Sequence, residues 1–319
     1  MKLLVTGASG RIGRALCIRL AREHRVQGLD RTPSSTAHWV GDLGDRRLLA
    51  QALRGVDAVL HTAALHAPQV GWVDDAEFDR INVQATRQLA EAAIAAGVSQ
   101  LVYTSTTALY GAAARPAGAA GWVDEDLPPQ PRTVYHRSKL AAEQLLQSLA
   151  EAGGFALTVL RMGRCFPEPA PQMALARLHC GIDARDVADA HARALATACP
   201  GWRRLLLSGA TPFLPQDAAA LQRDAAGVLR LRAPALVAAF AARGWPLPAQ
   251  IDRVYLSARA QQALGWRPRF GFDEVLRQLD AESPEVLPPG LIPALPPPTA
   301  ADPEGRSAAR RSSLQDPCR

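Results

Sequence analysis

The sequence predicts an α/β fold built on a doubly wound parallel sheet, with a small C-terminal helical region. Short apolar runs of strand type alternate with amphipathic helical runs along the first two hundred residues. The first apolar run ends in a glycine-rich turn that opens directly into a helix. Small or hydroxyl-bearing residues follow several later runs. Because ligands bind at the carboxyl ends of the strands in such sheets, these residues mark the edge where we expect a ligand.

The composition is that of a globular protein with a well-buried core. The chain has 319 residues, of which 48% are apolar and 21% charged. Its net charge of +6 comes from interleaved basic and acidic residues, and its few aromatic residues form no stacking platform, so we expect no nucleic-acid partner. Neither a membrane-spanning apolar run nor a signal peptide is evident, which predicts a cytoplasmic protein. The five cysteines lack metal-ligand spacing, so we expect free thiols and no metal.

The glycine turn follows a strand at residues 3–5 and has the spacing of a dinucleotide-binding corner. Gly7 permits a tight turn, Gly10 lets backbone N–H groups approach a pyrophosphate, and Gly13 lets the next helix pack on the strand. Taken alone, the stretch also fits an ordinary glycine loop. The cofactor contacts predicted here are Gly7, Gly10, Arg11, Ile12 and Gly13.

The second strand, residues 26–29, ends at Asp30, about 20 residues beyond the glycines. A carboxylate at this place accepts hydrogen bonds from the adenosine ribose hydroxyls and repels a 2′-phosphate, which favours NAD. Arg31 follows directly and could pair with that phosphate, so NADP stays possible. If the glycine turn is only a loop, Asp30 is a solvated acid at a strand end.

The ends of two further predicted strands carry more candidate ligand-binding residues. A short strand at residues 39–40 precedes Asp42 and Leu43, and a helix runs on to residue 53. A buried strand from residue 58 runs into Ala63 and Ala64, whose small side chains leave room for a ligand. We assign no chemistry to the nearby histidines, His61 and His66.

A helix of about residues 76–96, containing Asn82, leads to a strand at residues 100–103 and the hydroxyl cluster 104–107. Such a cluster at a strand end points toward the ligand crevice, although threonine is also common in ordinary strands. Residues 112–131 have loop composition, and we interpret the acidic run 124–126 within them as a solvated face.

Tyr135 and Lys139 lie four residues apart at the start of a helix that continues to about residue 149. Residues with this spacing share a helix face and can point at one bound group. A surface pair is the alternative interpretation of an isolated YxxxK. Lys139 is, however, the only lysine besides Lys2 among 36 basic residues. Because arginine cannot replace a compact ammonium, this bias singles out Lys139 as a functional residue.

The rest of the sequence predicts how the chain is divided into domains. A strand at residues 156–160, a helix at about 185–198 and a strand at 204–207 complete the sheet, and helices with proline breaks follow up to residue 279. We expect a dinucleotide-binding domain at residues 1–207, with 163–182 contributing to the substrate site, and a small substrate-binding region at 208–282. Prolines crowd the remainder, which predicts a disordered tail over residues 283–319.

These motifs together resemble the extended short-chain dehydrogenase/reductase family, which includes nucleotide-sugar epimerases and dehydratases and has a Rossmann domain. The resemblance covers about residues 1–280. It implies a homodimer through the helices near 76–96 and 135–150. It also adds Asp42, Leu43, Ala63, Ala64, Asn82, Tyr135 and Lys139 to the cofactor contacts.

The resemblance implies catalytic roles for Thr106, Tyr135 and Lys139. Tyr135 would move a hydroxyl proton while hydride passes between substrate and nicotinamide. Lowering a tyrosine pKa from about 10 toward 7 requires roughly 4 kcal/mol, which the Lys139 ammonium and the positive nicotinamide ring would supply. Lys139 would also hold the nicotinamide ribose, and Thr106, or else Ser105, would hydrogen-bond the substrate oxygen.

The substrate segment departs from that of family members that bind nucleotide sugars. Only about twenty residues separate Arg161 from Asp183, which indicates a smaller substrate. Residues 161–169 are similar to the matching segment of uronate dehydrogenases, and the candidate substrate residues are Thr107, Arg164 and Arg177. We expect an NAD-dependent oxidoreductase acting on a small hydroxy or carbonyl compound, such as a sugar or sugar acid. The alternatives are an epimerase or dehydratase that keeps its cofactor bound, and a non-catalytic NAD(P)-sensing protein.

Overall fold

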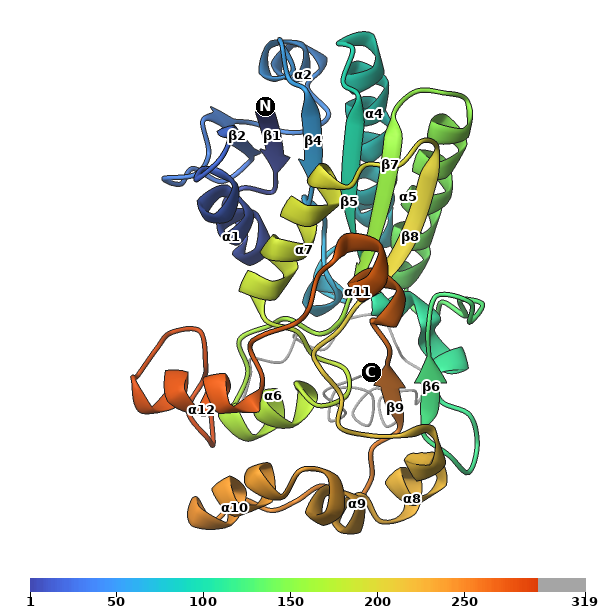
Figure 1. Cartoon of the computed structure of the whole chain (residues 1–319). Helices are drawn as coiled ribbons and strands as arrows, with labels where there is room; N and C mark the ends of the chain where they lie inside the picture. Colours follow the sequence, from blue (N-terminus) through green and yellow to red (C-terminus); the bar gives the residue numbers. More distant parts are fainter. Residues whose placement is uncertain (292–319) are drawn as a thin grey trace, which may run out of the picture.

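The computed structural model describes residues 1–291 and contains a seven-stranded sheet, which confirms the predicted fold class (Figure 1). Every neighbouring pair in this sheet is parallel, and the strand order is β3-β2-β1-β4-β5-β7-β8. The order reverses direction between β1 and β4, where doubly wound sheets open a crevice for ligands. The strands are β1 (Lys2–Thr6), β2 (Arg25–Asp30), β3 (Trp39–Val40), β4 (Ala58–His61), β5 (Gln100–Thr106), β7 (Ala156–Met162) and β8 (Trp202–Leu207).

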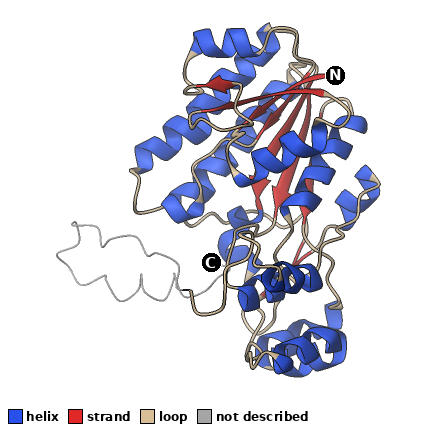
Figure 2. Ribbon diagram, turned by 90° about the vertical axis from the view of Figure 1, so that its left-hand side faces the viewer, coloured by secondary structure: helices blue, strands red, loops and turns tan. Residues whose placement is uncertain are grey.

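Helices cover both faces of the sheet (Figure 2), and the alternation of side chains along β1 explains why. Leu3 and Val5 point into a hydrophobic core shared with one layer of helices, whereas Leu4 points into a separate core shared with the other. Both faces of each strand are therefore apolar and need a cover. One layer consists of α1 (Arg11–Leu20), α7 (Ala184–Ala196) and α11 (Ala258–Leu264), and the other of α2 (Arg46–Ala52), α4 (Ala85–Ala95) and α5 (Val134–Glu151).

The helix predicted for residues 76–96 is interrupted. The structure forms α3 (Asp75–Asp79), one π-helical turn, η2 (Arg80–Gln84), and then α4. The wider turn places Asn82 in the interior, where its side chain bonds the backbone of Leu65 and the hydroxyl of Ser138. These amide bonds fix the loop after β4 against α5 and satisfy a buried polar group.

A second, smaller region lies at the carboxyl ends of the strands (Figure 1). Its two-stranded parallel sheet pairs β6 (Gly121–Val123) with β9 (Arg253–Tyr255). Its helices are α6 (Ala170–Ala176), α8 (Ala218–Arg223), α9 (Ala225–Arg232), α10 (Pro234–Ala242) and α12 (Phe272–Asp280). A third hydrophobic core joins the helices of this smaller region to β6 and β9.

Elsewhere in the described chain and in this region, short 3-10 turns lie at η1 (Ala67–Gln69), η3 (Thr107–Ala114) and η4 (Pro215–Asp217).

Two interpretations of this region need correction. Residues 112–131 are not a plain loop, because they contain β6. The acidic run 124–126 is not wholly a solvated face either, since Glu125 is buried and accepts the backbone N–H of Leu206 at 2.7 Å. Burial raises the pKa of this carboxyl, and the hydrogen bond opposes the rise. Glu125 therefore ties the connection after β6 to strand β8.

The start of the predicted disordered tail is ordered. Leu287 donates its N–H to the carbonyl of Glu168, and its own carbonyl accepts from Ala170, each at 2.9 Å. Val286 is buried in the third core. Residues 283–291 therefore pack along the entrance to α6, while the rest of the predicted tail, 292–319, lies outside the described residues.

Within residues 1–291, no single helix combines the length and hydrophobicity needed to span a bilayer; α9 and α10 reach that composition only together, as a pair bent by 110°.

Candidate active site

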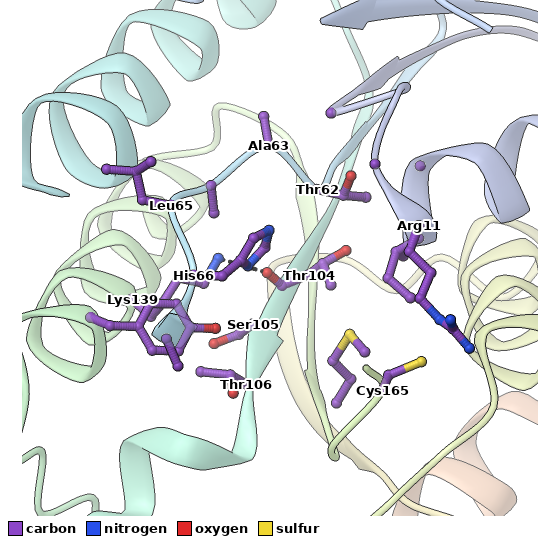
Figure 3. Close-up of a pocket in the computed structure, with 18 of the residues that line it drawn as sticks. Arg11, Thr62, Ala63, Leu65, His66, Thr104, Ser105, Thr106, Lys139 and Cys165 are labelled. Carbon is purple, nitrogen blue, oxygen red and sulfur yellow. Dashed lines mark hydrogen bonds between the residues drawn. The ribbon is translucent and has the colours of Figure 1, made fainter. Parts of the chain in front are cut away.

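A cavity of about 510 Å³ opens at the carboxyl ends of the strands, where the sheet order reverses (Figure 3). We call the part near the glycine turn, Asp30 and Asp42 the adenosine end, and the part near Thr106, Tyr135 and Lys139 the reaction end. Most residues predicted to bind cofactor or substrate line this one cavity. They are Gly7, Gly10, Arg11, Ile12, Gly13, Asp30, Asp42, Leu43, Ala63, Ala64, Thr106, Thr107, Tyr135, Lys139 and Arg164.

The glycine turn has the shape that a pyrophosphate requires. Gly7 has φ of +71°, and a Cβ atom on Gly13 would lie 2.0 Å from the Gly7 carbonyl oxygen, so neither position accepts a larger residue without strain. Gly10 is the N-cap of α1, and no side chain caps this helix end. The N–H groups of its first turn therefore face the cavity with the positive end of the helix dipole behind them. This cradle fits the phosphates of a dinucleotide.

Asp30 lies at the adenosine end and is fixed by two backbone hydrogen bonds. One carboxylate oxygen accepts from Ser9 N–H at 3.0 Å and the other from Thr32 N–H at 2.8 Å. Each oxygen keeps a further lone pair, so the group can still accept from ribose hydroxyls. Arg31 also lines the cavity, beside Asp30.

Asp42 marks the outer rim of the adenosine end. It accepts the N–H of Gly44 at 2.7 Å and pairs with Arg80 at 3.2 Å. Burial by itself would raise the pKa of Asp42, but these two donors outweigh it and hold the pKa below its usual range. Asp42 is therefore ionised at neutral pH.

The reaction end brings together the three residues predicted to be catalytic. Helix α5 begins directly before Tyr135 because Thr133 caps it, accepting the N–H of His136 at 3.2 Å. One turn later the Lys139 ammonium donates to the carbonyl of Thr104 at 2.8 Å and lies 4.1 Å from the centre of the Tyr103 ring. Figure 3 shows Lys139, Ser105 and Thr106 on one side of the cavity, with Arg11 and Cys165 across from them.

Burial is the largest influence on the pKa values of Tyr135 and Lys139. It raises the pKa of the Tyr135 phenol to about 12, although a side-chain hydrogen bond with Thr106 lowers it. It also lowers the pKa of Lys139 to about 7, against the opposing charge of Glu143. The expected phenol pKa near 7 therefore requires positive charge beyond what the described residues supply.

Two predicted site residues do not line the cavity. Asn82 is held in the interior by the loop after β4 and by Ser138, and its side chain is not part of the cavity wall. Arg177 is buried and pairs with Asp183 at 3.1 Å. Arg164 does line the cavity, and its guanidinium forms a two-pronged pair with Glu168.

The remaining lining residues include Ser105, the predicted alternative to Thr106, and several residues that were not predicted from the sequence. His66 lies near Tyr135, with ring centres 6.4 Å apart, and Ser105 is buried with its hydroxyl unpartnered among the described residues. The strand-end position of Ser105 is the signal that favoured it as the alternative to Thr106. Met162, Cys165, Phe166, Pro167 and Cys180 lie in or beside residues 163–182, the segment predicted to contribute to the substrate site, but they were not singled out individually. Arg253 and Tyr255 come from a distant segment that carries no recognisable pattern.

Comparisons with known proteins agree with this geometry. Residues 3–175 match the model of the NAD dependent epimerase/dehydratase family. The chain is 32% identical over 171 residues to the L-arabinose 1-dehydrogenase (NAD(P)(+)) of Haloferax volcanii, a match that covers 51% of this chain and 66% of that enzyme. The matches to the first curated relatives span 39% to 66% of those proteins' lengths.

Solved structures share the fold over most of the described chain. A short-chain dehydrogenase/reductase superfamily protein from Agrobacterium tumefaciens, solved with bound NAD, has a TM-score of 0.67 and 25% identity, covering 88% of this chain and 96% of that one. A mutated uronate dehydrogenase has a TM-score of 0.62 and 19% identity, covering 89% and 86%, and so shares the fold. The chain therefore belongs to the NAD dependent epimerase/dehydratase family, within the extended short-chain dehydrogenase/reductases, and its cofactor is NAD.

Proposed function

We propose that this protein is an NAD-dependent dehydrogenase that oxidises a small hydroxy compound, or reduces the matching carbonyl compound, of the sugar or sugar-acid class. The observation that carries the proposal is the convergence of Thr106, Tyr135 and Lys139 in the same cavity as the glycine turn. A phenol, a hydroxyl and an ammonium at one end of a dinucleotide cradle are what hydride transfer to or from an alcohol carbon requires.

The chain's own residues hold the cofactor in this proposal. The N–H groups at the start of α1 bind the pyrophosphate, Asp30 accepts from the adenosine ribose, and Lys139 donates to the nicotinamide ribose. When bound, NAD supplies the hydride acceptor and, in its oxidised form, a positive ring. Because Asp30 would repel a 2′-phosphate, we propose a preference for NAD over NADP.

Tyr135 handles the proton. Its phenol lies beside the Thr106 hydroxyl, so a substrate oxygen that meets both is held and can lose its proton to Tyr135. Positive charge near the buried phenol lowers its pKa from about 12, which makes phenolate accessible. The Lys139 ammonium would also lower the pKa of the phenol, although burial leaves the ammonium only partly protonated at neutral pH.

The residues that line the proposed substrate side of the cavity favour a small molecule. The short segment between β7 and α7 sends Phe166 and Pro167 into the cavity, and β9 adds Tyr255. A nucleotide diphosphate sugar needs an extended binding surface, which this short segment does not offer. The similarity to an L-arabinose dehydrogenase supports the same substrate size.

An epimerase that keeps NAD bound is the second candidate, because the matching family includes epimerases. A dehydratase is less well supported. Elimination of water needs a further acid and base, and among the described lining residues the carboxylates are Asp30 and Asp42, both at the adenosine end. A non-catalytic sensor has no need for Thr106, Tyr135 and Lys139 together.

The deciding experiment measures the NADH absorbance band after the protein and NAD are mixed, one compound at a time, with aldoses, uronates and simple secondary alcohols. We expect NADH formation with at least one sugar or sugar acid and none in Tyr135→Phe. Nucleotide that co-purifies with a protein that forms no NADH would support the epimerase. A protein that binds no nucleotide would overturn both.

We also propose the homodimer through α4 and α5 that the resemblance implies, and a cytoplasmic location. Sedimentation equilibrium measures the first; a monomer at micromolar concentration would contradict it.

A further inference from the structure

The Lys139 ammonium is held by two consecutive residues of β5, Tyr103 and Thr104. It donates to the Thr104 carbonyl at 2.8 Å, and its nitrogen lies 4.1 Å from the centre of the Tyr103 ring. A cation within about 6 Å of a ring centre is attracted by the negative face of the ring. Lys139 is only 3% exposed and Tyr103 only 1%. The ring face and the carbonyl therefore replace much of the water that would otherwise solvate this charge.

The Tyr103 ring is itself fixed by neighbouring parts of the sheet. The ring of His61 on β4 packs beside it, with ring centres 5.4 Å apart. Both nitrogens of His61 are hydrogen-bonded, one to the Thr6 hydroxyl at 2.7 Å and the other to the Thr86 hydroxyl at 2.8 Å. Thr6 ends β1 and directly precedes the glycine turn, and Thr86 lies on α4. The aromatic face that contacts the ammonium is thus supported from β1, β4 and α4, which keeps it at a defined position.

The hydroxyl of Tyr103 takes no part in this contact. It is buried and makes no hydrogen bond among the described residues. Burial raises the pKa of this phenol well above its ordinary value, so the ring carries no charge of its own. The part of Tyr103 that acts on Lys139 is therefore the aromatic face, which a phenylalanine would also provide.

The other titratable groups near Lys139 offer its charge little support. Among the described residues, the carboxylate that raises the pKa of Lys139 is Glu143, one helical turn along α5. Glu143 already pairs with the buried Arg161 at 2.6 Å, which offsets its negative charge. His61, and His66 in the loop after β4, are neutral at pH 7, because desolvation and the Lys139 charge lower their pKa values to about 3 and about 4.

We propose that Tyr103 is a positioning residue for the reaction: its ring face, together with the Thr104 carbonyl, keeps the Lys139 ammonium charged and aimed into the cavity. This inference deepens the proposed dehydrogenase function and rests on it. An ammonium has three N–H donors. One donates to Thr104 and one faces the ring, which leaves one for the nicotinamide ribose, while the charge of the group acts on the neighbouring Tyr135 phenol.

The chain has two lysines, Lys2 and Lys139, so protein labelled with ¹³Cε-lysine gives one signal from each. The Lys139 signal recorded against pH measures the pKa of Lys139 independently of turnover, with Lys2 as the internal reference. An aromatic face also displaces the signals of protons above it upfield, so the ε-protons of Lys139 report the contact directly. The spectra are taken on the full-length protein without added nucleotide.

The test compares the wild-type protein with Tyr103→Phe, Tyr103→Leu and the control Phe155→Leu. Phe155 is buried in the same hydrophobic core as Tyr103 but directly precedes β7, at the end of the sheet away from the cavity. Its variant reports the cost of replacing a buried aromatic residue by leucine in this core. Melting curves report folding, and kcat/KM is measured at pH 6 and 7 with NAD and the compound that yields most NADH.

We expect the Lys139 ε-protons of wild type and Tyr103→Phe to lie upfield of those of Lys2, with Lys139 pKa values that agree within about 0.3. Tyr103→Leu should abolish the upfield displacement and lower the pKa of Lys139 by about 0.5 to 1, because the ring attracts only the charged form. Its kcat/KM should fall about 2- to 5-fold at pH 7 and less than about 2-fold at pH 6, where Lys139 stays protonated. Phe155→Leu should keep the wild-type pKa and pH dependence.

An unchanged Lys139 pKa in folded Tyr103→Leu would overturn the inference, as would a pKa lowered equally in Tyr103→Phe. A loss of kcat/KM that is the same at pH 6 and 7 would assign Tyr103 a structural role only and overturn it as well. The wild-type spectrum tests the contact even where Tyr103→Leu does not fold, since Lys139 protons without upfield displacement exclude the ring face. If no compound yields NADH, the proposed function fails, and the Lys139 titration still decides whether Tyr103 holds the ammonium.

Discussion

Arg11 and Glu285 form an ion pair of 2.7 Å that joins the glycine turn to the last described segment of the chain. Arg11 lines the cavity, and Glu285 lies in residues 283–291, which also pair with the backbone on either side of Pro169. The phosphate cradle and the loop that bears Phe166 are therefore both in contact with one short segment.

Glu285→Gln should tighten NAD binding about two- to five-fold, because Arg11 then offers its full charge to the phosphates. The Glu285 side chain is half exposed, so removal of its charge should cost little stability and shift the melting temperature by no more than about 2 °C. Titration of NAD by calorimetry checks this. Glu282→Gln, a change three residues earlier in the chain, is the control, and weaker NAD binding in Glu285→Gln would show that the pair positions Arg11 instead.

Tyr135→Phe should lower kcat by about 10²- to 10⁴-fold, the usual contribution of a positioned acid–base group. NAD affinity should stay within about two-fold, because the phenol acts mainly in the transition state. Steady-state kinetics and NAD titration measure the two quantities. Tyr110→Phe is the matched control, since Tyr110 is also buried but does not line the cavity. Full activity in Tyr135→Phe would remove this residue from the mechanism.

Lys139 should make stability depend on pH. Its pKa is lowered from 10.5 to about 7 by burial, so between these values the unfolded chain binds more protons than the native one. Stability should therefore rise with pH from about 7 to 9.5, by at most about 1.4 kcal/mol per pH unit, and Lys139→Met should lack this rise. Above that window the Tyr135 phenol, with its pKa raised to about 12, works in the opposite direction. Urea unfolding at four pH values tests the prediction, and parallel curves for the two proteins would contradict it.

Asp30→Ser should reduce the preference for NAD over NADP by about ten-fold or more, because the repulsion of a 2′-phosphate disappears while Arg31 remains to pair with it. The ratio of kcat/KM for the two cofactors measures this. Arg31→Ala is the complementary variant, which should weaken NADP use and leave NAD use within about two-fold. Loss of both cofactors in Asp30→Ser, with a lower melting temperature, would instead indicate that the bond to Ser9 supports the turn.

Asn82→Ala should act on stability more than on cofactor binding. The amide makes three buried hydrogen bonds, so its loss should cost roughly 2–3 kcal/mol in the free energy of unfolding. NAD affinity should change by less than about three-fold. Gln84→Ala, on the same π-helical turn but exposed, is the control for helix propensity. A large loss of NAD affinity with unchanged stability would restore the predicted cofactor role.

The parts of the site that the sequence predicts are those whose geometry is local. Gly7 and Gly13 are separated by six residues, Tyr135 and Lys139 by one helical turn, and Asp30 follows its own strand directly. In each case backbone geometry fixes the relationship before any distant contact forms. The lining of the adenosine end and the three residues that we propose to be catalytic could therefore be placed by pattern.

The parts that escaped prediction depend on contacts between remote segments. Strands β6 and β9 have three residues each, too few to show a periodicity, and Arg253 reaches the cavity only through their pairing. Glu125 looked solvated because its neighbours are acidic, whereas its partner is the backbone of Leu206. Likewise, proline content predicted disorder at Val286, which a hydrophobic core in fact holds.

The pairing of β6 with β9 bears on how specificity could be re-engineered in this scaffold. The wall that carries Arg253 and Tyr255 is built half from the connection between β5 and α5 and half from the far end of the chain. A chimera that exchanged only residues 208–291 with a homologue would pair a foreign β9 with the native β6. Transplanting substrate choice therefore requires exchanging residues 112–131 together with the C-terminal region, as one non-contiguous module.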